Sequence, residues 1–173
     1  MLYFVSGGSA SGKSALAERI CAAFPGEHIY IATMPVRSGE DERKVARHHA
    51  LRAGRGFATL EMPGRLTAVP PDAAVLLECL STFTANRMFS GETSGDWEAQ
   101  LWSELAPLLD RPGPTVIVSA DAAADGIAYD AYTEDYRRVL TGLGLRLCVR
   151  ADCAVEAVCG LAKFHKGSAP KGV

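Results

Sequence analysis

The sequence predicts an α/β fold with a mostly parallel sheet covered by helices on both faces, and three observations support it. Short apolar, β-rich runs recur along the 173 residues, and segments with helical spacing lie between them. The composition, 48% hydrophobic and 22% charged, suits a globular chain with a substantial core. Strands that alternate with helices form parallel sheets, because each crossover helix returns the chain to the same edge. No linker, repeat or low-complexity tract divides the sequence, so we expect a single domain over residues 1–173.

The expected strands are apolar runs and the expected helices are the periodic segments between them. Strands are expected at LYFV (2–5), HIYIAT (28–33), AVLLECL (74–80) and TVIVSA (115–120), with weaker candidates at ATLEM (58–62) and AVEAVCG (154–160). Helices are expected at ALAERI (15–20), EDERKVARHHALR (40–52), a piece after Thr82, WEAQLWSELAPLLDR (97–111) and AYTEDYRRVLTGL (131–143).

The stretch GGSASGKS links the first expected strand to the first expected helix. Gly7, four further residues and then Gly12-Lys13-Ser14 satisfy G-x-x-x-x-G-K-[ST], the phosphate-binding loop. Small residues let backbone N–H groups turn toward phosphate oxygens, and the helix start adds a partial positive charge. We therefore expect a P-loop nucleoside-triphosphate-binding fold; the alternative is a glycine-rich turn capped by Ser14. The expected phosphate contacts are Gly7, Gly8, Ser9, Ala10, Ser11, Gly12, Lys13 and Ser14.

Two side chains of this motif and one distant carboxylate predict catalysis of phosphoryl transfer. Lys13 can reach the β- and γ-phosphates, and Ser14 can ligate Mg²⁺. Glu78 ends the apolar run Val75-Leu76-Leu77, which is how phosphate-loop proteins place a carboxylate beside the metal. The alternative is an acidic strand terminus that faces solvent.

The expected helix at 40–52 carries a histidine between two cations. Lys44, His48 and Arg52 share one face at four-residue spacing. Cations at this spacing lower the pKa of the imidazole, which keeps it neutral and nucleophilic, and they attract an anion such as a polyphosphate. A solvated basic face with two surface histidines explains the same residues, and the pattern alone does not decide between the two.

Charge and cysteine content exclude several classes of protein. A net charge of −2 and a pI near 6.1 do not favour a nucleic-acid partner, so we expect a small-molecule partner. The short apolar run at the N-terminus resembles neither a signal peptide nor a membrane span, which makes the cytoplasm the expected location. The five cysteines form no C-x-x-C pair, so we expect mostly buried thiols rather than disulfides or a zinc site.

Several motifs together resemble one enzyme family. GGSASGKS, IYIAT, RHHALR, TLEMP and LLECLSTFTANRMF follow one another in the order and spacing of the bifunctional adenosylcobinamide kinase / adenosylcobinamide-phosphate guanylyltransferases. The resemblance covers residues 1 to about 90 and continues more faintly to the end. A phosphate loop is shared by very many proteins, whereas its combination with the histidine pair and LLEC is much more specific.

The resemblance implies a two-step reaction and a role for each matching residue. Enzymes of the family phosphorylate a hydroxyl of adenosylcobinamide, a corrinoid, and then transfer GMP from GTP to that phosphate through a histidine-bound GMP. ATP and GTP are thus implied as substrates and Mg²⁺ as cofactor, with His48 as the nucleophile and a homotrimer as the assembly. The family pattern places nucleotide contacts at Ala32, Thr33, Met34, His49, Arg52, Glu61 and Glu78. A carboxylate that accepts the N1–H and N2–H of guanine selects GTP, and either Glu61 or Glu78 could supply it.

The chain departs from the family pattern in its last third. Where relatives carry Thr-Asn-Glu-Val-Gly and then Gly-Ile-Val-Pro, this chain reads SADAAADGIAYD, with Ala120 for the asparagine, Asp121 for the glutamate and Tyr129 for the proline. Gly144 takes the place of another asparagine, and the ending reads Gly160-Leu161-Ala162. The phosphate loop and His48 are unchanged.

Two other functions fit the same motifs. Another small-molecule P-loop kinase would need Lys13, Ser14 and Glu78 but not His48. A GTP-binding regulatory module would bind the nucleotide without guanylyl transfer.

Overall fold

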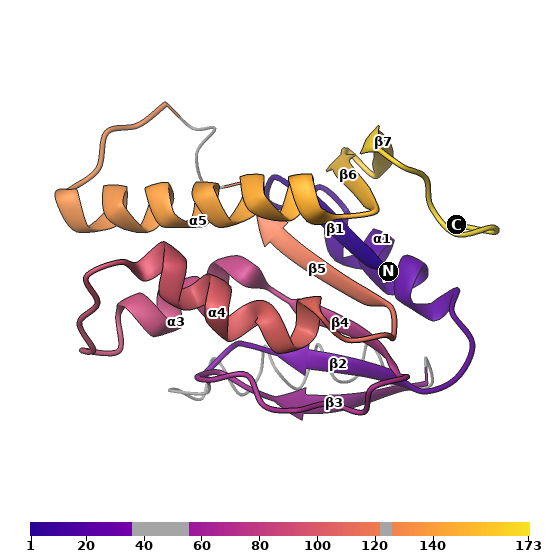
Figure 1. The fold of residues 1–173 in the computed structure, drawn as a ribbon. Coiled ribbons are helices and arrows are strands. Elements are labelled where there is room, and N and C mark those ends of the chain that lie inside the picture. The colour runs from indigo at the N-terminus through magenta and orange to yellow at the C-terminus, as the bar shows by residue number, and fades with distance from the viewer. Residues whose placement is uncertain (36–55, 122–125) are drawn as a thin grey trace.

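The computed structural model describes residues 1–35, 56–121 and 126–173, which form one seven-stranded sheet with helices against both faces (Figure 1). The predicted α/β fold is confirmed, and each predicted strand is present within a few residues of its expected limits. The strands are β1 (Leu2–Gly7), β2 (His28–Ala32), β3 (Phe57–Glu61), β4 (Ala74–Glu78), β5 (Thr115–Ala120), β6 (Cys153–Val158) and β7 (Leu161–Lys166).

The strand order is β3-β2-β4-β5-β1-β6-β7, and every neighbouring pair up to β6 is parallel. β7 runs antiparallel to β6. This last strand was not predicted, and the expected strand at 154–160 in fact ends at Val158 and turns back. Cys159 and Gly160 make the turn with positive φ angles of 49° and 83°. All six residues of β7 are exposed, so it lacks the apolar run that marks the buried strands.

Four described helices cover the sheet. They are α1 (Lys13–Ala22), α3 (Leu80–Met88), α4 (Trp97–Leu109) and α5 (Ala131–Arg150). α4 stops two residues before its predicted end, where Asp110 is the C-cap. α5 runs seven residues beyond the predicted 143, because Leu147 continues the buried face of Leu140 and Leu143. The helix expected at 40–52 lies outside the described residues.

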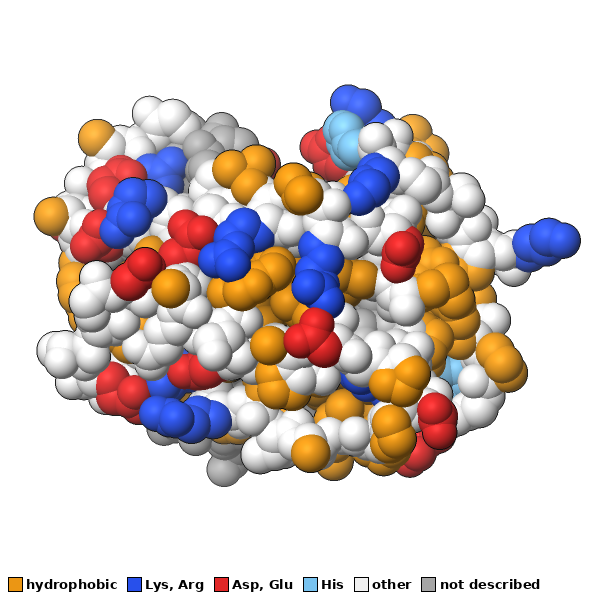
Figure 2. Space-filling view, in the orientation of Figure 1, with side chains coloured by type: hydrophobic (Ala, Val, Ile, Leu, Met, Phe, Trp, Pro, Cys, Tyr) orange, Lys and Arg blue, Asp and Glu red, His pale blue; other side chains and the backbone are white. Residues whose placement is uncertain are grey.

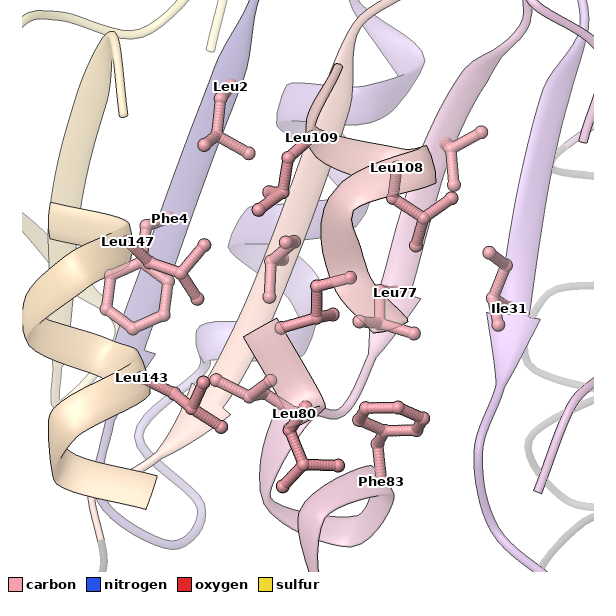
Figure 3. Packing of buried hydrophobic residues seen from close by; sticks show 14 of the residues in the cluster. Leu2, Phe4, Ile31, Leu77, Leu80, Phe83, Leu108, Leu109, Leu143 and Leu147 are labelled. Atoms are coloured by element: carbon pink, nitrogen blue, oxygen red, sulfur yellow. The ribbon is translucent and has the colours of Figure 1, made fainter. Parts of the chain in front are cut away.

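The two faces of the sheet support two separate cores. Along β1, Leu2 and Phe4 belong to the cluster beneath α3, α4 and α5, while Tyr3 and Val5 belong to the cluster beneath α1. This alternation is the two-residue period of a strand. Figure 3 shows the first cluster, in which residues from β1, β2 and β4 meet leucines of α4 and α5. Both faces of the parallel strands are therefore covered, as predicted.

The expectation of mostly buried thiols needs one correction. Cys21 and Cys153 are buried and Cys79 and Cys148 are half-buried, but Cys159 is exposed because it lies in the β6–β7 turn. Burial raises the pKa of Cys21 to about 12, which makes that thiol unreactive. In the described part of the chain no helix is both long and apolar enough to cross a membrane.

A buried arginine joins α3 to α4. The Arg87 side chain is 4% exposed, and its guanidinium donates to Glu104 at 3.0 and 3.1 Å and to Glu92 at 2.8 and 2.9 Å. These hydrogen bonds hold the pKa of Arg87 above its ordinary value, and they lower the pKa of Glu92. The Glu104 side chain is itself only 16% exposed, and both of its carboxylate oxygens accept hydrogen bonds from Arg87.

We expect Arg87→Met to lower the free energy of unfolding by about 3 kcal/mol, because it leaves the Glu104 carboxylate largely buried without its cation. Arg138→Met is the control, since that arginine pairs with Asp135 on the surface of α5, and it should change stability by less than about 0.5 kcal/mol. Urea unfolding measures both. Equal effects of the two substitutions would contradict a stabilising role for the Arg87 pair.

Candidate nucleotide-binding site

The loop between β1 and α1 is pressed against β6 and the β6–β7 turn. A Cβ atom on Gly7, whose φ is +155°, would lie 2.6 Å from the carbonyl oxygen of Ala157. A Cβ on Gly12, whose φ is +92°, would lie 3.3 Å from the Cα of Gly160. The N–H of Gly160 donates to the Ser11 carbonyl at 2.9 Å. Both motif glycines are thus required by close backbone contacts, which is the shape expected of a phosphate loop.

The start of α1 offers donors to an anion. Gly12 is the N-cap and supplies no side chain to the first N–H groups of the helix, and Lys13 follows directly with its Nζ 3.0 Å from the Gly8 carbonyl oxygen. The Ser11 hydroxyl is buried and has no hydrogen-bond partner among the described residues. Backbone donors, a lysine and a hydroxyl at a helix N-terminus form a cradle for phosphate oxygens. Ser9 and Ala10 complete the loop.

The Glu78 carboxylate meets the loop from the end of β4. The Ser14 hydroxyl donates to Glu78 Oε1, and the Tyr30 hydroxyl donates to Glu78 Oε2 at 3.1 Å. Ser14 therefore does not cap a glycine-rich turn, and Glu78 does not simply face solvent. A hydroxyl and a carboxylate are oxygen ligands of the kind that Mg²⁺ prefers. The described residues contain no group of three or more His, Cys, Asp or Glu that could hold a metal ion.

The ends of β2, β3 and β4 are aligned by their register. Ala32 is paired with Glu61 on one side and with Glu78 on the other, so the two predicted glutamates flank the end of β2. Glu61 is exposed, whereas Glu78 is half-buried beside Ser14. The buried Thr33 hydroxyl accepts from the Cys79 N–H at 2.9 Å, so this side chain fixes the loop after β4.

Two residues of the site were missed in the sequence. Tyr30 lies between Ile29 and Ile31 in β2, and its hydroxyl donates to Glu78. Asn86 on α3 donates to the Thr33 carbonyl at 2.6 Å and to the Pro63 carbonyl at 2.8 Å, which joins the loops after β2 and β3. A buried tyrosine tip and a helix amide that needs partners are the signals that could have indicated them.

The histidine helix is not among the described residues. Lys44, His48, His49 and Arg52 all lie in the segment 36–55, and Met34 is the last predicted contact before it. Their roles stay predictions from the sequence.

A phosphate loop at the carboxyl ends of parallel strands, with a carboxylate from a second strand on its serine, defines a P-loop nucleotide-binding protein. The family follows from the whole chain: the model for "CobU: Cobinamide kinase / cobinamide phosphate guanyltransferase" matches residues 3–164. The chain belongs to this family.

Two relatives and one solved structure are similar to this chain. A bifunctional adenosylcobalamin biosynthesis protein, CobP of Pseudomonas aeruginosa, is 29% identical over 171 residues, which cover 94% of this chain and 96% of the relative. CobU of Salmonella typhimurium, another bifunctional adenosylcobalamin biosynthesis protein, is 25% identical over 178 residues, which cover 93% of this chain and 97% of the relative. An ATPase from the type III secretion system of pathogenic bacteria has a TM-score of 0.53 at 15% identity, with 94% of this chain and 57% of that chain covered, and it supports the fold alone.

Glu78→Gln should raise the Mg²⁺ concentration needed for half-maximal ATP binding roughly tenfold or more, because the amide lacks the charge that attracts the ion. The substitution keeps the shape of the side chain, so the melting temperature should change little. Glu27→Gln is the matched control, because Glu27 directly precedes β2 and therefore lies at the amino end of the strands. The measurement is ATP binding titrated against Mg²⁺. An unchanged Mg²⁺ requirement would mean that Glu78 has only a structural role.

Proposed function

We propose that this protein phosphorylates a hydroxyl of adenosylcobinamide with a nucleoside triphosphate, and then transfers GMP from GTP to that phosphate to give adenosylcobinamide-GDP. The observation that carries the proposal is the meeting of Lys13, Ser14 and Glu78 at one phosphate loop, in a chain whose family match spans residues 3–164. ATP and GTP are the proposed substrates.

In the kinase step, the loop amides and Lys13 hold the β- and γ-phosphates, where they offset the charge of the transferring group. Ser14 and Glu78 would hold Mg²⁺. When bound, the ion neutralises phosphate charge and fixes the phosphate orientation. The acceptor hydroxyl loses its proton to water and forms the new O–P bond, and the bond from the γ-phosphorus to the nucleoside diphosphate breaks.

In the second step, we assign His48 as nucleophile. Its neutral imidazole attacks the α-phosphorus of GTP, pyrophosphate leaves, and a phosphoramidate forms. A phosphate oxygen of the corrinoid then attacks the same phosphorus and releases the imidazole. Lys44 and Arg52, one turn to either side in the sequence pattern, suit the phosphates, and His49 and Arg52 would contact the nucleotide.

The geometry also supports separate tasks for the two glutamates. Glu78 contacts Ser14, which favours the metal, whereas Glu61 is exposed at the end of β3. We propose that Glu61 accepts the N1–H and N2–H of guanine, above the loop formed by Ala32, Thr33 and Met34. Adenine lacks this pair of donors, so this contact selects GTP.

With GTP and Mg²⁺ the protein should gain the mass of one GMP, and His48→Ala should abolish this adduct while His49→Ala only weakens it. A phosphoramidate is labile to acid and stable to base, so brief acid treatment should remove the label. Mass spectrometry of the intact protein makes the measurement.

Three outcomes separate the candidate functions. Full labelling of His48→Ala would refute the nucleophile. Phosphorylation of adenosylcobinamide with no adduct on the native protein would indicate a kinase without guanylyl transfer. GTP binding without either reaction would indicate a regulatory module.

We also propose a homotrimer, as the family resemblance implies. The edge strand β7 supports an interface, because all of its residues are exposed and Leu161 is 75% and Phe164 42% exposed. Sedimentation at micromolar concentration should give three times the chain mass of 18.4 kDa. A stable monomer would contradict the trimer.

A further inference from the structure

A cavity of about 220 Å³ lies on the α5 side of the sheet, beside the start of the phosphate loop. We name it the α5 cavity. It is lined by Ser6 and Gly7 at the end of β1, Asp121 after β5, Thr141 and Gly144 on α5, and Glu156 on β6. The Asp121 N–H donates to the Gly7 carbonyl at 3.2 Å, so the cavity adjoins the first residue of the loop.

The charges of the α5 cavity are opposite to those of the phosphate loop. Its lining contains two carboxylates, Asp121 and Glu156, and neither Lys nor Arg. His165 lies with Nε2 3.0 Å from Glu156 Oε2, which fixes that carboxylate from the neighbouring strand. Carboxylates accept hydrogen bonds and repel phosphate. The cavity therefore suits a group rich in O–H or N–H donors and disfavours a nucleotide.

Short side chains line one wall of the α5 cavity. Ala120, Asp121 and Gly144 all belong to this lining. A Cβ on Gly144 would meet only the Phe4 ring, at 3.7 Å, which leaves open space above the helix. The space thus depends on short side chains.

The α5 cavity is open to solvent on one side and has a volume of about 220 Å³, which leaves room for a short side arm. Outside, Leu145 and Val149 are 64% and 80% exposed one turn apart on α5, and Leu145 also lines the cavity. Figure 2 shows the surface hollowed beside the β6–β7 hairpin, with hydrophobic side chains along the lower margin of the hollow.

We propose that the α5 cavity is the acceptor subsite of the kinase step and takes the hydroxyl-bearing side arm of the corrinoid. Asp121 and Glu156 accept hydrogen bonds from the arm, and Leu145 and Val149 support the ring outside. The arm's hydroxyl then lies at Gly7, the first residue of the loop that holds the transferring phosphate. This inference rests on the proposed function, which supplies the corrinoid.

Binding of adenosylcobinamide to the full chain, measured by calorimetry with a non-hydrolysable ATP analogue present, tests the proposal. Gly144→Leu fills the cavity with a residue that favours helix and should weaken corrinoid binding at least roughly tenfold, whereas Gly144→Ala should stay within about twofold. Glu156→Gln keeps the side-chain shape and should weaken binding roughly tenfold through the lost charged acceptor. Asp135→Asn, on the exposed surface of the same helix, is the matched control.

The outcomes distinguish the cavity from the proposed function. Affinities of Gly144→Leu and Glu156→Gln equal to that of the native chain would overturn the acceptor subsite and leave the corrinoid assignment standing. A native chain that forms the GMP adduct but does not bind adenosylcobinamide would overturn the corrinoid assignment and this inference with it. The adduct itself should form unchanged in both variants, because the cavity does not hold the nucleotide.

Discussion

The alignment of parallel strand ends is the constraint on which the site depends. Glu78 can reach Ser14 only because β4 and β1, separated by β5, end at the same edge of the sheet. The same register places Ala32 between Glu61 and Glu78. Parallel strands carry their functional residues at their carboxyl ends for this reason, and helix N-termini point to the same edge. The buried, apolar lengths of β1, β4 and β5 hold this register, since a slip of one residue would move core side chains to the wrong face.

The two faces of β1 separate two kinds of chemistry. Toward α1, the chain presents backbone N–H groups, Lys13 and a buried hydroxyl, all of which suit phosphate. Toward α5, it presents Asp121, Glu156 and hydroxyl groups around a small cavity. Gly7 belongs to both, because it begins the loop and lines the cavity. The end of β1 thus borders both a site that suits an anion and a site that suits a donor-rich group.

The fold could be predicted from the sequence largely because its strands are buried on both faces. Continuous apolar runs marked β1, β2, β4 and β5, and the G-x-x-x-x-G-K-S spacing fixed the loop between β1 and α1. β7 was missed because an exposed edge strand has no such run. The motif indicated Ser14 and the end of the apolar run at 75–77 indicated Glu78, but the contact between them depends on strand order, which no local pattern contains. The roles of Tyr30 and Asn86 were missed for the same reason, since their hydrogen-bond partners are 48 and 53 residues away in the sequence.

The opposite charges of the two sites give a physical reason for two consecutive reactions on one corrinoid. In the proposed scheme, the hydroxyl arm enters the α5 cavity uncharged and leaves the kinase step as a phosphate. Asp121 and Glu156 then repel the group they had bound, so the arm is released from the cavity once it has reacted. Lys44 and Arg52, which flank the proposed nucleophile His48 in the sequence, would attract the same phosphate. Under this proposal, the change of charge that the first reaction makes favours release of the arm for the second.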